Sequence, residues 1–457
     1  MTKSFDALII GAGQAGPPLV GRLTGAGMTV ALVERHLFGG TCVNTGCTPT
    51  KTLVASAEVA HLARRARDFG VNIEGPVCVD MRTTKARKDS VVMASRTGLE
   101  KWLRGLERCT VLQGHARFES PHTVRVGDEL LSAERIFVNV GGRAVVPDMP
   151  GVDRVPFLTN TSILELETLP RHLVVIGGSY IGLEFAQMYR RFGSEVTVVE
   201  MGPRLIGKED EDVSAAIEGL FAQEGIMVRT AAECIRLGQR GQEISAGVNC
   251  MQGDPEVIGS HVLLAVGRRP NTDDLAVEKS GLKLDKHGYI VVDDELRTNV
   301  PGIWALGDCN GRGAFTHTAY NDYQIVASNL LDGGSRRVTD RIPCYALFID
   351  PPLGRVGMTE REAHAAQRKI RIGNRPMTRV NRAVEKGQSS GFMKVMVDAE
   401  TNEILGAAIL GVGGDEAVHA VLDTMSAKTP FTTLRDTVHI HPTVAELIPT
   451  ILGELKP

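Results

Sequence analysis

Two cysteines, Cys42 and Cys47, lie five positions apart in the segment GGTCVNTGCTPTK, residues 39–51. In an ideal α-helix, Cα atoms at this spacing are roughly 8.6 Å apart, whereas a disulfide needs about 4.4–6.8 Å. Gly46 relaxes the backbone between the two cysteines, and we expect Pro49 to interrupt the helical hydrogen bonds just after them. The segment therefore permits a bend in which the two sulfurs meet. The alternative is two unpaired thiols buried in a helix.

A glycine-rich turn near the N-terminus lies between two predicted strands. Residues 7–10 are a short apolar run of the kind expected of a buried parallel strand, and a G-x-G-x-x-G turn follows at once. A helical stretch then runs to about residue 27, and a strand at 29–33 ends at Glu34, 23 residues after the first glycine. Such glycines allow a tight turn, the helix N-terminus holds a pyrophosphate, and the acid accepts hydrogen bonds from a ribose. The pattern predicts a dinucleotide-binding unit whose binding residues are Gly11, Gly13, Gly16 and Glu34.

The same order of elements recurs in the middle of the chain. A strand at 173–176, a glycine turn, a helix at 183–192 and a strand at 195–199 lead to Glu200, again 23 residues after the first glycine. Two such units in one chain indicate two different nucleotides. The predicted binding residues of the second turn are Gly177, Ser179 and Gly182, with the serine in place of the middle glycine.

Glu200 bears on the choice between the two pyridine nucleotides. An acid at this position favours the free 2′-hydroxyl of NADH, because a 2′-phosphate would meet like charge. Arg204 lies four residues further on and could soften that preference. The sequence therefore predicts NADH as the reductant and leaves NADPH possible.

Length and composition limit the class of protein. At 457 residues the chain is too long for one core, so we expect two to four domains. Its 43% apolar and 23% charged residues are typical of a soluble globular protein, and a net charge of −3 favours neither nucleic acid nor an acidic membrane surface. No apolar run approaches the length of a membrane span, and the N-terminus leads directly into a strand pattern that leaves no room for a signal peptide.

Cysteine usage points to a reducing compartment. Eight cysteines in a chain of this size do not make a disulfide scaffold, and one clustered pair with six scattered singles suggests a cytoplasmic enzyme with a redox pair. The single cysteines are most simply interpreted as small apolar residues. They are Cys78, Cys109, Cys234, Cys250, Cys309 and Cys344.

Together these motifs resemble the pyridine nucleotide-disulfide oxidoreductases, which include dihydrolipoamide dehydrogenase, glutathione reductase and mercuric reductase. The resemblance implies FAD and NAD(P)H as cofactors. It also implies that Cys47 lies against the flavin and exchanges electrons with it, while Cys42 faces the substrate and attacks it. Lys51 would stand near the flavin and pair with Glu184 of the second unit, and Tyr180 would cover the flavin until nicotinamide arrives. The plainer alternatives are a surface ion pair and a tyrosine at a domain interface.

Further segments extend the resemblance towards the C-terminus. Residues 262–271 and 298–308 are similar to the family's return to the FAD domain and to its second FAD motif, in which Asp308 binds the ribityl hydroxyls. The resemblance assigns Thr41 and Gly142 to FAD and Gly267 to the pyridine nucleotide. From residue 341 onward, alternating strands and helices resemble the dimerisation domain.

The segment HIHPTVAE, residues 439–446, resembles the family's acid–base site. His441 would be the acid–base residue and Glu446 would orient it, both supplied by the second subunit of a homodimer. An imidazole suits this role because its pKa lies near neutrality. His439 is more simply a packed strand residue.

The expected fold class is α/β: two Rossmann-like dinucleotide-binding domains and an α+β C-terminal dimerisation domain. The predicted boundaries are 1–148 and 270–337 for the FAD domain, 149–269 for the NAD(P) domain and 338–457 for the dimerisation domain. Between the cysteine pair and the end of the first domain, residues 52–120 are predicted to be helical and then irregular. No nucleic acid, membrane or metal-binding residue is predicted.

Three functions remain open at this point. The first is an NAD(P)H-dependent reductase that passes electrons through Cys42 and Cys47 to a small disulfide or oxidised thiol. The second is a reductase of Hg(II) or Cu(II), because residues 39–53 and 315–323 look closest to mercuric reductase-like members, although the C-terminal cysteine pair of mercuric reductase is missing. The third is a non-catalytic flavoprotein or metal-sequestering subunit. Binding alone would need none of the residues Lys51, Glu184, His441 and Glu446, so their presence argues against the third.

Overall fold

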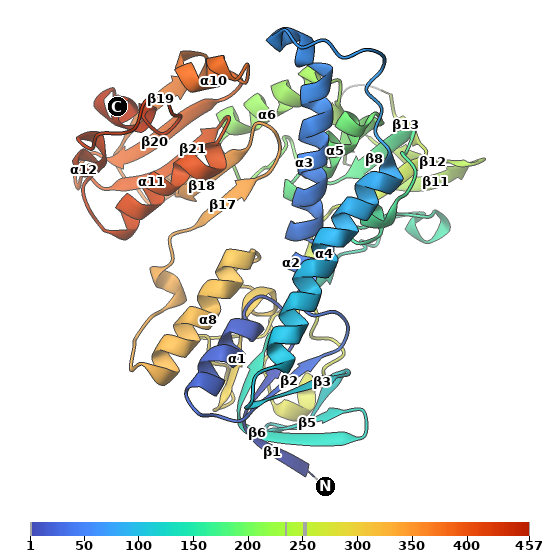
Figure 1. Ribbon diagram of the computed structural model, residues 1–457, viewed down its shortest axis with the longest axis vertical. Coiled ribbons are helices and arrows are strands. Elements are labelled where there is room, and N and C mark those ends of the chain that lie inside the picture. Colours follow the sequence, from blue (N-terminus) through green and yellow to red (C-terminus); the bar gives the residue numbers. More distant parts are fainter. Residues whose placement is uncertain (1, 234, 250–253, 457) are drawn as a thin grey trace.

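A seven-stranded sheet forms the lower part of the molecule (Figure 1). The computed structural model describes residues 2–233, 235–249 and 254–456. The sheet has the order β3-β2-β1-β6-β5-β4, and β16 pairs in parallel with β6. Its strands are β1 (Thr2–Ile10), β2 (Val30–Glu34), β3 (Cys109–Gln113), β4 (Ala116–Ser120), β5 (Thr123–Val126), β6 (Glu129–Val138) and β16 (Ile303–Ala305).

The apolar run of β1 is buried on both faces of this sheet. Ala7 and Ile9 pack in the same core as the apolar residues of α1 (Gly16–Gly25) and α8 (Thr316–Leu331). Leu8 and Ile10, which point the other way because side chains alternate along a strand, pack in the core formed with β4 and β5. Continuous burial of this kind explains why the sequence shows an apolar run here and no alternation.

The second unit is a four-stranded parallel sheet in the order β10-β9-β8-β14. Its strands are β8 (His172–Ile176), β9 (Glu195–Val199), β10 (Met227–Arg229) and β14 (His261–Leu264). Helices α5 (Tyr180–Phe192) and α6 (Glu211–Gln223) pack on one face, and a three-stranded antiparallel sheet packs on the other. That sheet contains β11 (Arg236–Arg240), β12 (Glu243–Gly247) and β13 (Glu256–Gly259).

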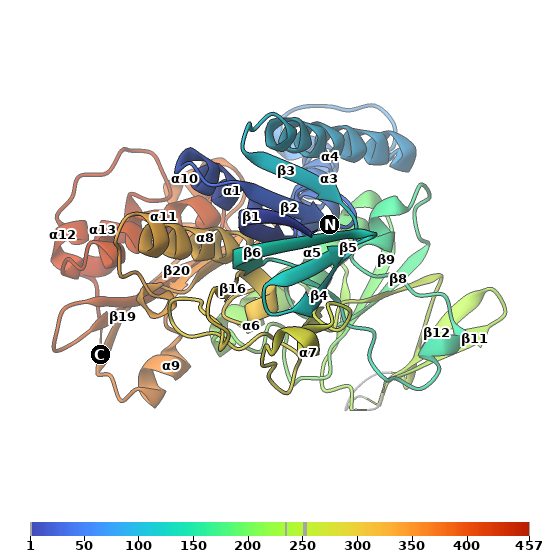
Figure 2. The same ribbon diagram turned by 90° about the horizontal axis from the view of Figure 1, so that it is seen from below.

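The C-terminal part is a five-stranded antiparallel sheet in the order β17-β18-β21-β20-β19. Seen from below, this sheet lies at the left and the second unit at the right (Figure 2), and apolar residues of the two pack in one core. The strands of the C-terminal sheet are β17 (Cys344–Leu347), β18 (Leu353–Gly357), β19 (Ile370–Pro376), β20 (Phe392–Asp398) and β21 (Ile404–Leu410). Its helices are α9 (Glu360–Ala365), α10 (Asn381–Glu385), α11 (Gly414–Ser426), α12 (Phe431–Arg435) and α13 (Leu447–Gly453).

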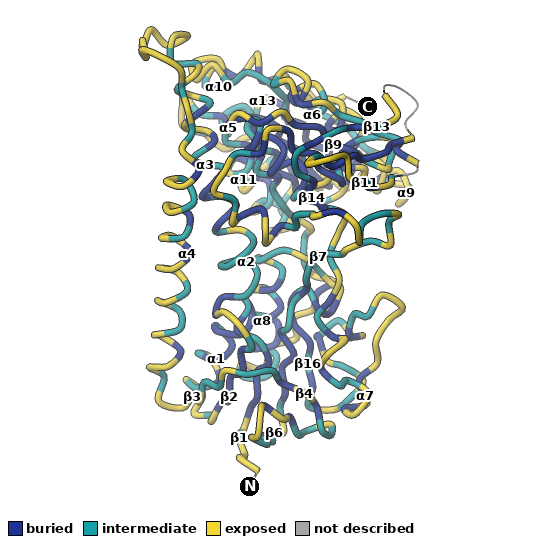
Figure 3. The backbone as a smooth tube through the Cα atoms, turned by 90° about the vertical axis from the view of Figure 1, so that its right-hand side faces the viewer, coloured by how far each residue is buried: buried dark blue, intermediate teal, exposed yellow. Residues whose placement is uncertain are grey.

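Two helices connect the lower and upper parts of the molecule. Helix α3 (Cys47–Arg64) runs upward, and helix α4 (Met81–Arg104) returns downward to the first sheet, where β3 follows it (Figure 1). The Asp80 carboxylate caps α4 by accepting hydrogen bonds from the backbone N–H groups of Arg82 and Thr83. Figure 3 shows α4 along one side of the molecule with much of its length exposed. The cysteine pair therefore lies at the start of a helix that reaches from one nucleotide unit towards the other.

The predicted α/β fold class is confirmed, and β2, β8 and β9 lie within one residue of their predicted positions, whereas β1 begins five residues before the predicted start at residue 7. The domain boundaries remain predictions. The prediction that residues 52–120 end in irregular structure is wrong, because β3 and β4 lie there. β3 is an edge strand whose residues are only partly buried, so it lacks the apolar run that marks β1.

Candidate functional site

The backbone breaks between the two cysteines. Short helix α2 (Gly40–Thr45) carries Cys42 and ends at Gly46, whose dihedral angles of φ −135° and ψ −116° are not helical. A Cβ atom at Gly46 would lie 2.9 Å from the backbone oxygen of Thr41, so the bend requires glycine. Cys47 then begins α3, and both cysteines are free thiols in the structure.

Pro49 does not interrupt the helix as predicted. It is the third residue of α3, and the next residue, Thr50, already donates its N–H to the backbone oxygen of Gly46. The first N–H groups of a helix have no partner within the helix, so a proline in this turn removes no hydrogen bond. The bend therefore comes from Gly46 alone.

The two thiols are strongly polarised. A hydrogen bond from Cys42, together with Thr316 and the charge of Lys51, lowers the pKa of Cys47 to about 6 against the effect of burial. The same hydrogen bond, with burial, raises the pKa of Cys42. Cys47 is therefore the thiolate of the pair, and Cys42 keeps its proton.

Lys51 and Glu184 form an ion pair between the two nucleotide units. The distance from Lys51 Nζ to Glu184 Oε2 is 2.5 Å, and the Glu184 side chain is buried. The other oxygen of Glu184 accepts a hydrogen bond of 3.0 Å from the backbone N–H of Phe348, whose ring lies 4.6 Å from Lys51 Nζ. This burial distinguishes the contact from an ordinary surface ion pair. It also fixes the lysine charge one helical turn after Cys47.

Three aromatic rings meet at the start of α5. Tyr180 packs edge-on against Phe315, at 5.9 Å between ring centroids, and against Tyr345, at 5.2 Å. Phe315 and Tyr345 stack on each other at 5.7 Å, and the Tyr345 hydroxyl donates to the buried carboxylate of Glu209. Tyr180 therefore lies at an interface, as in the plainer interpretation, and also faces the cavity described next.

One cavity of about 2160 Å³ joins the two nucleotide units. Ligand pockets in proteins are typically about 300–1,000 Å³, so this cavity has room for two dinucleotides end to end. Most of the predicted binding and redox residues line it: Gly11, Gly13, Glu34, Thr41, Cys42, Cys47, Lys51, Gly177, Ser179, Tyr180, Glu184, Glu200, Gly267 and Asp308.

Three predicted glycines lie outside this cavity. Gly142 lines an adjoining cavity of about 1080 Å³. Gly16 and Gly182 serve the turns themselves, because a Cβ atom at either would lie 2.5 Å or less from the backbone oxygen of the first glycine of the same turn. They allow the helix to approach the strand closely and do not line the cavity.

The two acids at the ends of β2 and β9 have the same surroundings. Glu34 accepts 2.8 Å hydrogen bonds from the N–H groups of Ala12 and His36, one on each oxygen. Glu200 accepts from the N–H groups of Gly178 and Gly202 at 2.6 and 2.7 Å. Each carboxylate is held at the cavity wall with lone pairs to spare, which suits the hydroxyls of a ribose. Both units therefore fit a dinucleotide.

Arg268 joins three of the residues assigned to FAD, and the sequence analysis missed it. Its Nη2 lies 3.4 Å from Asp308 Oδ2 and 3.4 Å from Thr41 Oγ1, and it donates to the backbone oxygen of Gly142 at 2.5 Å. Burial raises the pKa of Asp308, while the Arg268 charge opposes that shift. Arg268 directly follows Gly267 in residues 262–271, the segment that resembles the family's return to the FAD domain. This position could have indicated that Arg268 lies near FAD. Thr316, which contacts Cys47, was missed in the same way.

His441 and Glu446 form a pair away from the cysteines of the same chain. His441 Nδ1 lies 2.9 Å from Glu446 Oε2, and the histidine side chain is 69% exposed. Neither residue is among the described residues that line the cavity. Val438 and Ile440 beside the pair are 95% and 80% exposed, which is unusual for apolar residues and is typical of a surface that another chain covers.

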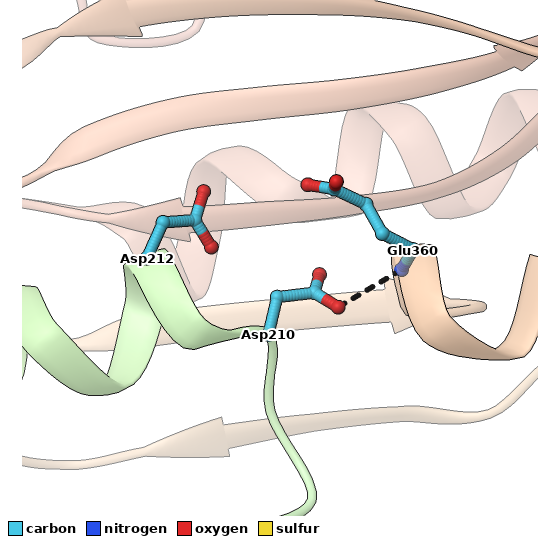
Figure 4. A group of neighbouring side chains, drawn as sticks. All are labelled: Asp210, Asp212 and Glu360. Carbon is cyan, nitrogen blue, oxygen red and sulfur yellow. Dashed lines mark hydrogen bonds between the residues drawn. The ribbon is translucent and has the colours of Figure 1, made fainter.

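A group of carboxylates lies at the contact between the second unit and the C-terminal sheet. Asp210 and Asp212 at the start of α6 face Glu360 at the start of α9 (Figure 4). Lys394 Nζ lies among their oxygens, at 3.1 Å from Asp210, 2.8 Å from Asp212 and 2.5 Å from Glu360. Burial alone would lower the pKa of Lys394, but hydrogen bonds to Asp212 and Glu360 raise it. The Lys394 ammonium group, together with Arg355, whose Nη2 lies 3.2 Å from Asp210 Oδ2, therefore supplies the positive charge next to these carboxylates.

The single cysteines differ among themselves. Cys309 is fully buried, as predicted for a small apolar residue, whereas Cys109 and Cys344 are partly buried. Cys78 is exposed, so the prediction is wrong for this residue. Cys234 and Cys250 lie outside the described residues.

Comparison with known proteins decides the family. Residues 5–322 match the family model of the pyridine nucleotide-disulphide oxidoreductases, and residues 344–451 match the dimerisation domain of the same family. The chain belongs to the pyridine nucleotide-disulphide oxidoreductase family. The family resemblance inferred from the sequence is thereby confirmed.

Several members of this family are similar over nearly their whole length. The probable pyridine nucleotide-disulfide oxidoreductase RclA of Escherichia coli is 35% identical, over 99% of this chain and 100% of the relative. The mercuric reductase of Streptomyces lividans is 33% identical over 97% and 94%, and the dihydrolipoyl dehydrogenase of Thermus scotoductus is 31% identical over 97% and 96%. Among solved structures, the Cu(II) complex of the HOCl-induced flavoprotein disulfide reductase RclA superposes with a TM-score of 0.91 at 34% identity, covering 100% of both chains.

Membership of the pyridine nucleotide-disulphide oxidoreductase family makes this chain an NAD(P)H-dependent flavoprotein oxidoreductase, with FAD and a pyridine nucleotide as its cofactors. The dimerisation domain indicates a homodimer like that of other members. Among the described residues, no helix is both long and apolar enough to cross a membrane.

Proposed function

We propose that this enzyme uses NADH to reduce a disulfide between Cys42 and Cys47, and that the resulting thiols reduce a small disulfide or oxidised thiol. The observation that supports this most directly is the polarised pair beside the shared cavity, with Cys47 stabilised as a thiolate and Cys42 as a thiol. A protein that only bound a flavin would need neither feature.

The cysteines then act in a fixed order. Once Cys42 loses its proton, its thiolate attacks one sulfur of the substrate disulfide, so that a Cys42–sulfur bond forms as the substrate S–S bond breaks. The departing thiolate takes up a proton. Cys47 next attacks the Cys42 sulfur, which forms the Cys42–Cys47 disulfide and releases the second product thiol. Two electrons pass from the pair to the substrate, and NADH restores them.

The neighbouring residues prepare these steps. FAD, when bound, supplies the two-electron chemistry that links the nicotinamide to the cysteine pair. Glu184 holds Lys51 so that its charge favours the Cys47 thiolate. We expect Tyr180 to cover the flavin position and to move when nicotinamide enters. Thr41, Gly142 and Asp308 would hold FAD together with Arg268.

The raised pKa of Cys42 means that its proton must be taken by a base. The structure offers His441, oriented by Glu446 and exposed at a surface flanked by apolar side chains. We propose that His441 and Glu446 of one chain serve the cysteine pair of the other chain in a homodimer. This arrangement leaves each active site incomplete in an isolated chain.

NADH should reduce the enzyme about 10- to 100-fold faster than NADPH, since each factor of ten corresponds to about 1.4 kcal/mol and a 2′-phosphate would face the Glu200 carboxylate. We expect Arg204 not to offset this charge, because its Nη1 pairs with Glu211 at 2.9 Å. Stopped-flow reduction with each nucleotide measures the preference. Arg204→Ala should leave it unchanged, and equal rates in the unmodified enzyme would contradict the role of Glu200.

A metal-ion reductase is the second candidate. The observation that favours it is the similarity to mercuric reductase and to RclA, one of whose solved structures is a Cu(II) complex. Two adjacent thiols are suitable ligands for either soft ion. Transfer of Hg(II) from external thiols to a cysteine pair inside a cavity is easiest by exchange between thiolates, however, and residues 452–457 contain no cysteine that could take part in it.

Anaerobic NADH consumption separates the two candidates. We expect several small disulfides to sustain many turnovers, whereas Hg(II) in excess thiol should inhibit by remaining on Cys42 and Cys47. Cu(II), tested without free thiol, provides the third arm. Sustained turnover of either metal ion that requires Cys42, with every disulfide inert, would favour the metal-ion reductase.

A further inference from the structure

A threonine at the start of α8 contacts the redox pair. Thr316 is the first residue of this 16-residue helix, and its Oγ1 lies 3.2 Å from Cys47 Sγ. The same hydroxyl also acts to lower the pKa of Cys42, but the hydrogen bond with Cys47 and burial outweigh it and raise that pKa. Helix α8 is about 270 residues away along the chain, and it comes to the cysteines because it packs on the first sheet next to α1.

We propose that Thr316 is a positioning residue that holds Cys47 as the thiolate of the pair. A thiolate only accepts hydrogen bonds, so at this contact the threonine hydroxyl donates its single hydrogen to Cys47 Sγ. This assignment rests on the proposed function, in which Cys47 exchanges electrons with the flavin side of the site and Cys42 with the substrate.

The geometry gives Thr316 an effect that a packing residue would lack. As the first residue of α8, it places its hydroxyl and the positive end of the helix dipole at the same sulfur. Both favour negative charge on Cys47, in addition to the hydrogen bond from Cys42 and the charge of Lys51. Thr316 therefore adds to the stabilisation of negative charge at Cys47, the sulfur that its hydroxyl contacts at 3.2 Å.

Thr316 is not needed to cap the helix. That task falls to Thr318, whose Oγ1 accepts a hydrogen bond of 3.1 Å from the Phe315 N–H and donates to the Phe315 backbone oxygen at 2.7 Å. Thr318 lies in the same helical turn, and in the described part of the chain its hydroxyl bonds to Phe315 and to neither cysteine. It provides a control of the same residue type.

The test follows the pH dependence of Cys47 alkylation in the NADH-reduced, FAD-containing enzyme. Only the thiolate reacts with iodoacetamide, and mass spectrometry of the peptide distinguishes Cys47 from Cys42. The unmodified enzyme should show a midpoint at about pH 6. Thr316→Val keeps the shape of the side chain without the hydroxyl and should raise the midpoint by about one unit. Thr316→Ala should do the same, which covers the case in which valine disturbs folding.

Two further variants make the test specific. Thr316→Ser keeps the hydroxyl and should restore the low midpoint, and Thr318→Val should leave it unchanged. Any of three results would overturn the assignment. The first is an unchanged midpoint in Thr316→Val and Thr316→Ala, the second is a shift in Thr316→Ser as large as theirs, and the third is an equal shift in Thr318→Val. A midpoint near pH 8.5 in the unmodified enzyme would instead contradict the proposed polarity of the pair, whatever the Thr316 variants do.

Discussion

Cys42→Ser lowers turnover of a disulfide substrate by on the order of a thousandfold or more, because it removes the nucleophile that begins the exchange. The same variant keeps Cys47 as a thiolate beside the flavin, since a serine hydroxyl still donates a hydrogen bond at the position of the Cys42 thiol. It should therefore retain the long-wavelength absorbance of a thiolate in contact with a flavin. Steady-state NADH consumption and an absorbance spectrum of the same sample measure both effects.

Cys47→Ser should lose the turnover and the long-wavelength absorbance together. Cys78→Ser is the matched control, because Cys78 is exposed and does not line the cavity described above. If Cys42→Ser and Cys47→Ser gave the same spectrum, the two cysteines would not have the separate roles proposed for them.

Lys394→Met should destabilise the folded enzyme by about 3 kcal/mol, the lower end of the range for removing one partner of a buried ion pair. The Lys394 side chain is 2% exposed, and its loss leaves Asp212 and Glu360 without their buried cation, while Asp210 keeps Arg355, whose Nη2 lies 3.2 Å from Asp210 Oδ2. We take the lower end because Asp212 and Glu360 are 41% and 31% exposed, which lets water screen part of their repulsion. The midpoint of thermal unfolding of the FAD-bound enzyme measures the change.

Lys369→Met serves as the control for the lysine variant, because the ion pair of Lys369 with Glu400 lies in solvent on the same C-terminal domain. This change should leave the unfolding midpoint where it is. Equal effects of the two substitutions would mean that the buried charges around Lys394 contribute nothing particular to the contact between the domains.

Much of the fold could be predicted because its signals are local. In each nucleotide unit, an apolar strand (β1 or β8), a glycine turn and an acid (Glu34 or Glu200) follow one another within about thirty residues. Each of these patterns follows from the backbone conformation of the residues that carry it. Strand β3 was missed because an edge strand needs no apolar run. Pro49 was misinterpreted because the same residue breaks a helix interior and starts a helix, and only the position of Gly46 decides between them.

The site was harder to predict where it depends on contacts between distant segments. Lys51 and Glu184 were paired through family resemblance, since nothing in their separation along the chain requires the 2.5 Å contact. Thr316 and Arg268 contact Cys47 and Asp308 only because α8 and β15 (Arg268–Pro270) pack beside them. The Lys394 cluster lies between two domains, so no sequence pattern marks it.

The most direct test of the account is to count the reactive thiols of Cys42 and Cys47 before and after one equivalent of NADH. The enzyme is held without oxygen, denatured in excess iodoacetamide and digested, and the peptide that carries both cysteines is weighed. We predict no label on this peptide before NADH and two labels after it, with Cys78 labelled in both samples. The same labelling before and after NADH would contradict the claim that electrons from the nucleotide pass through this pair.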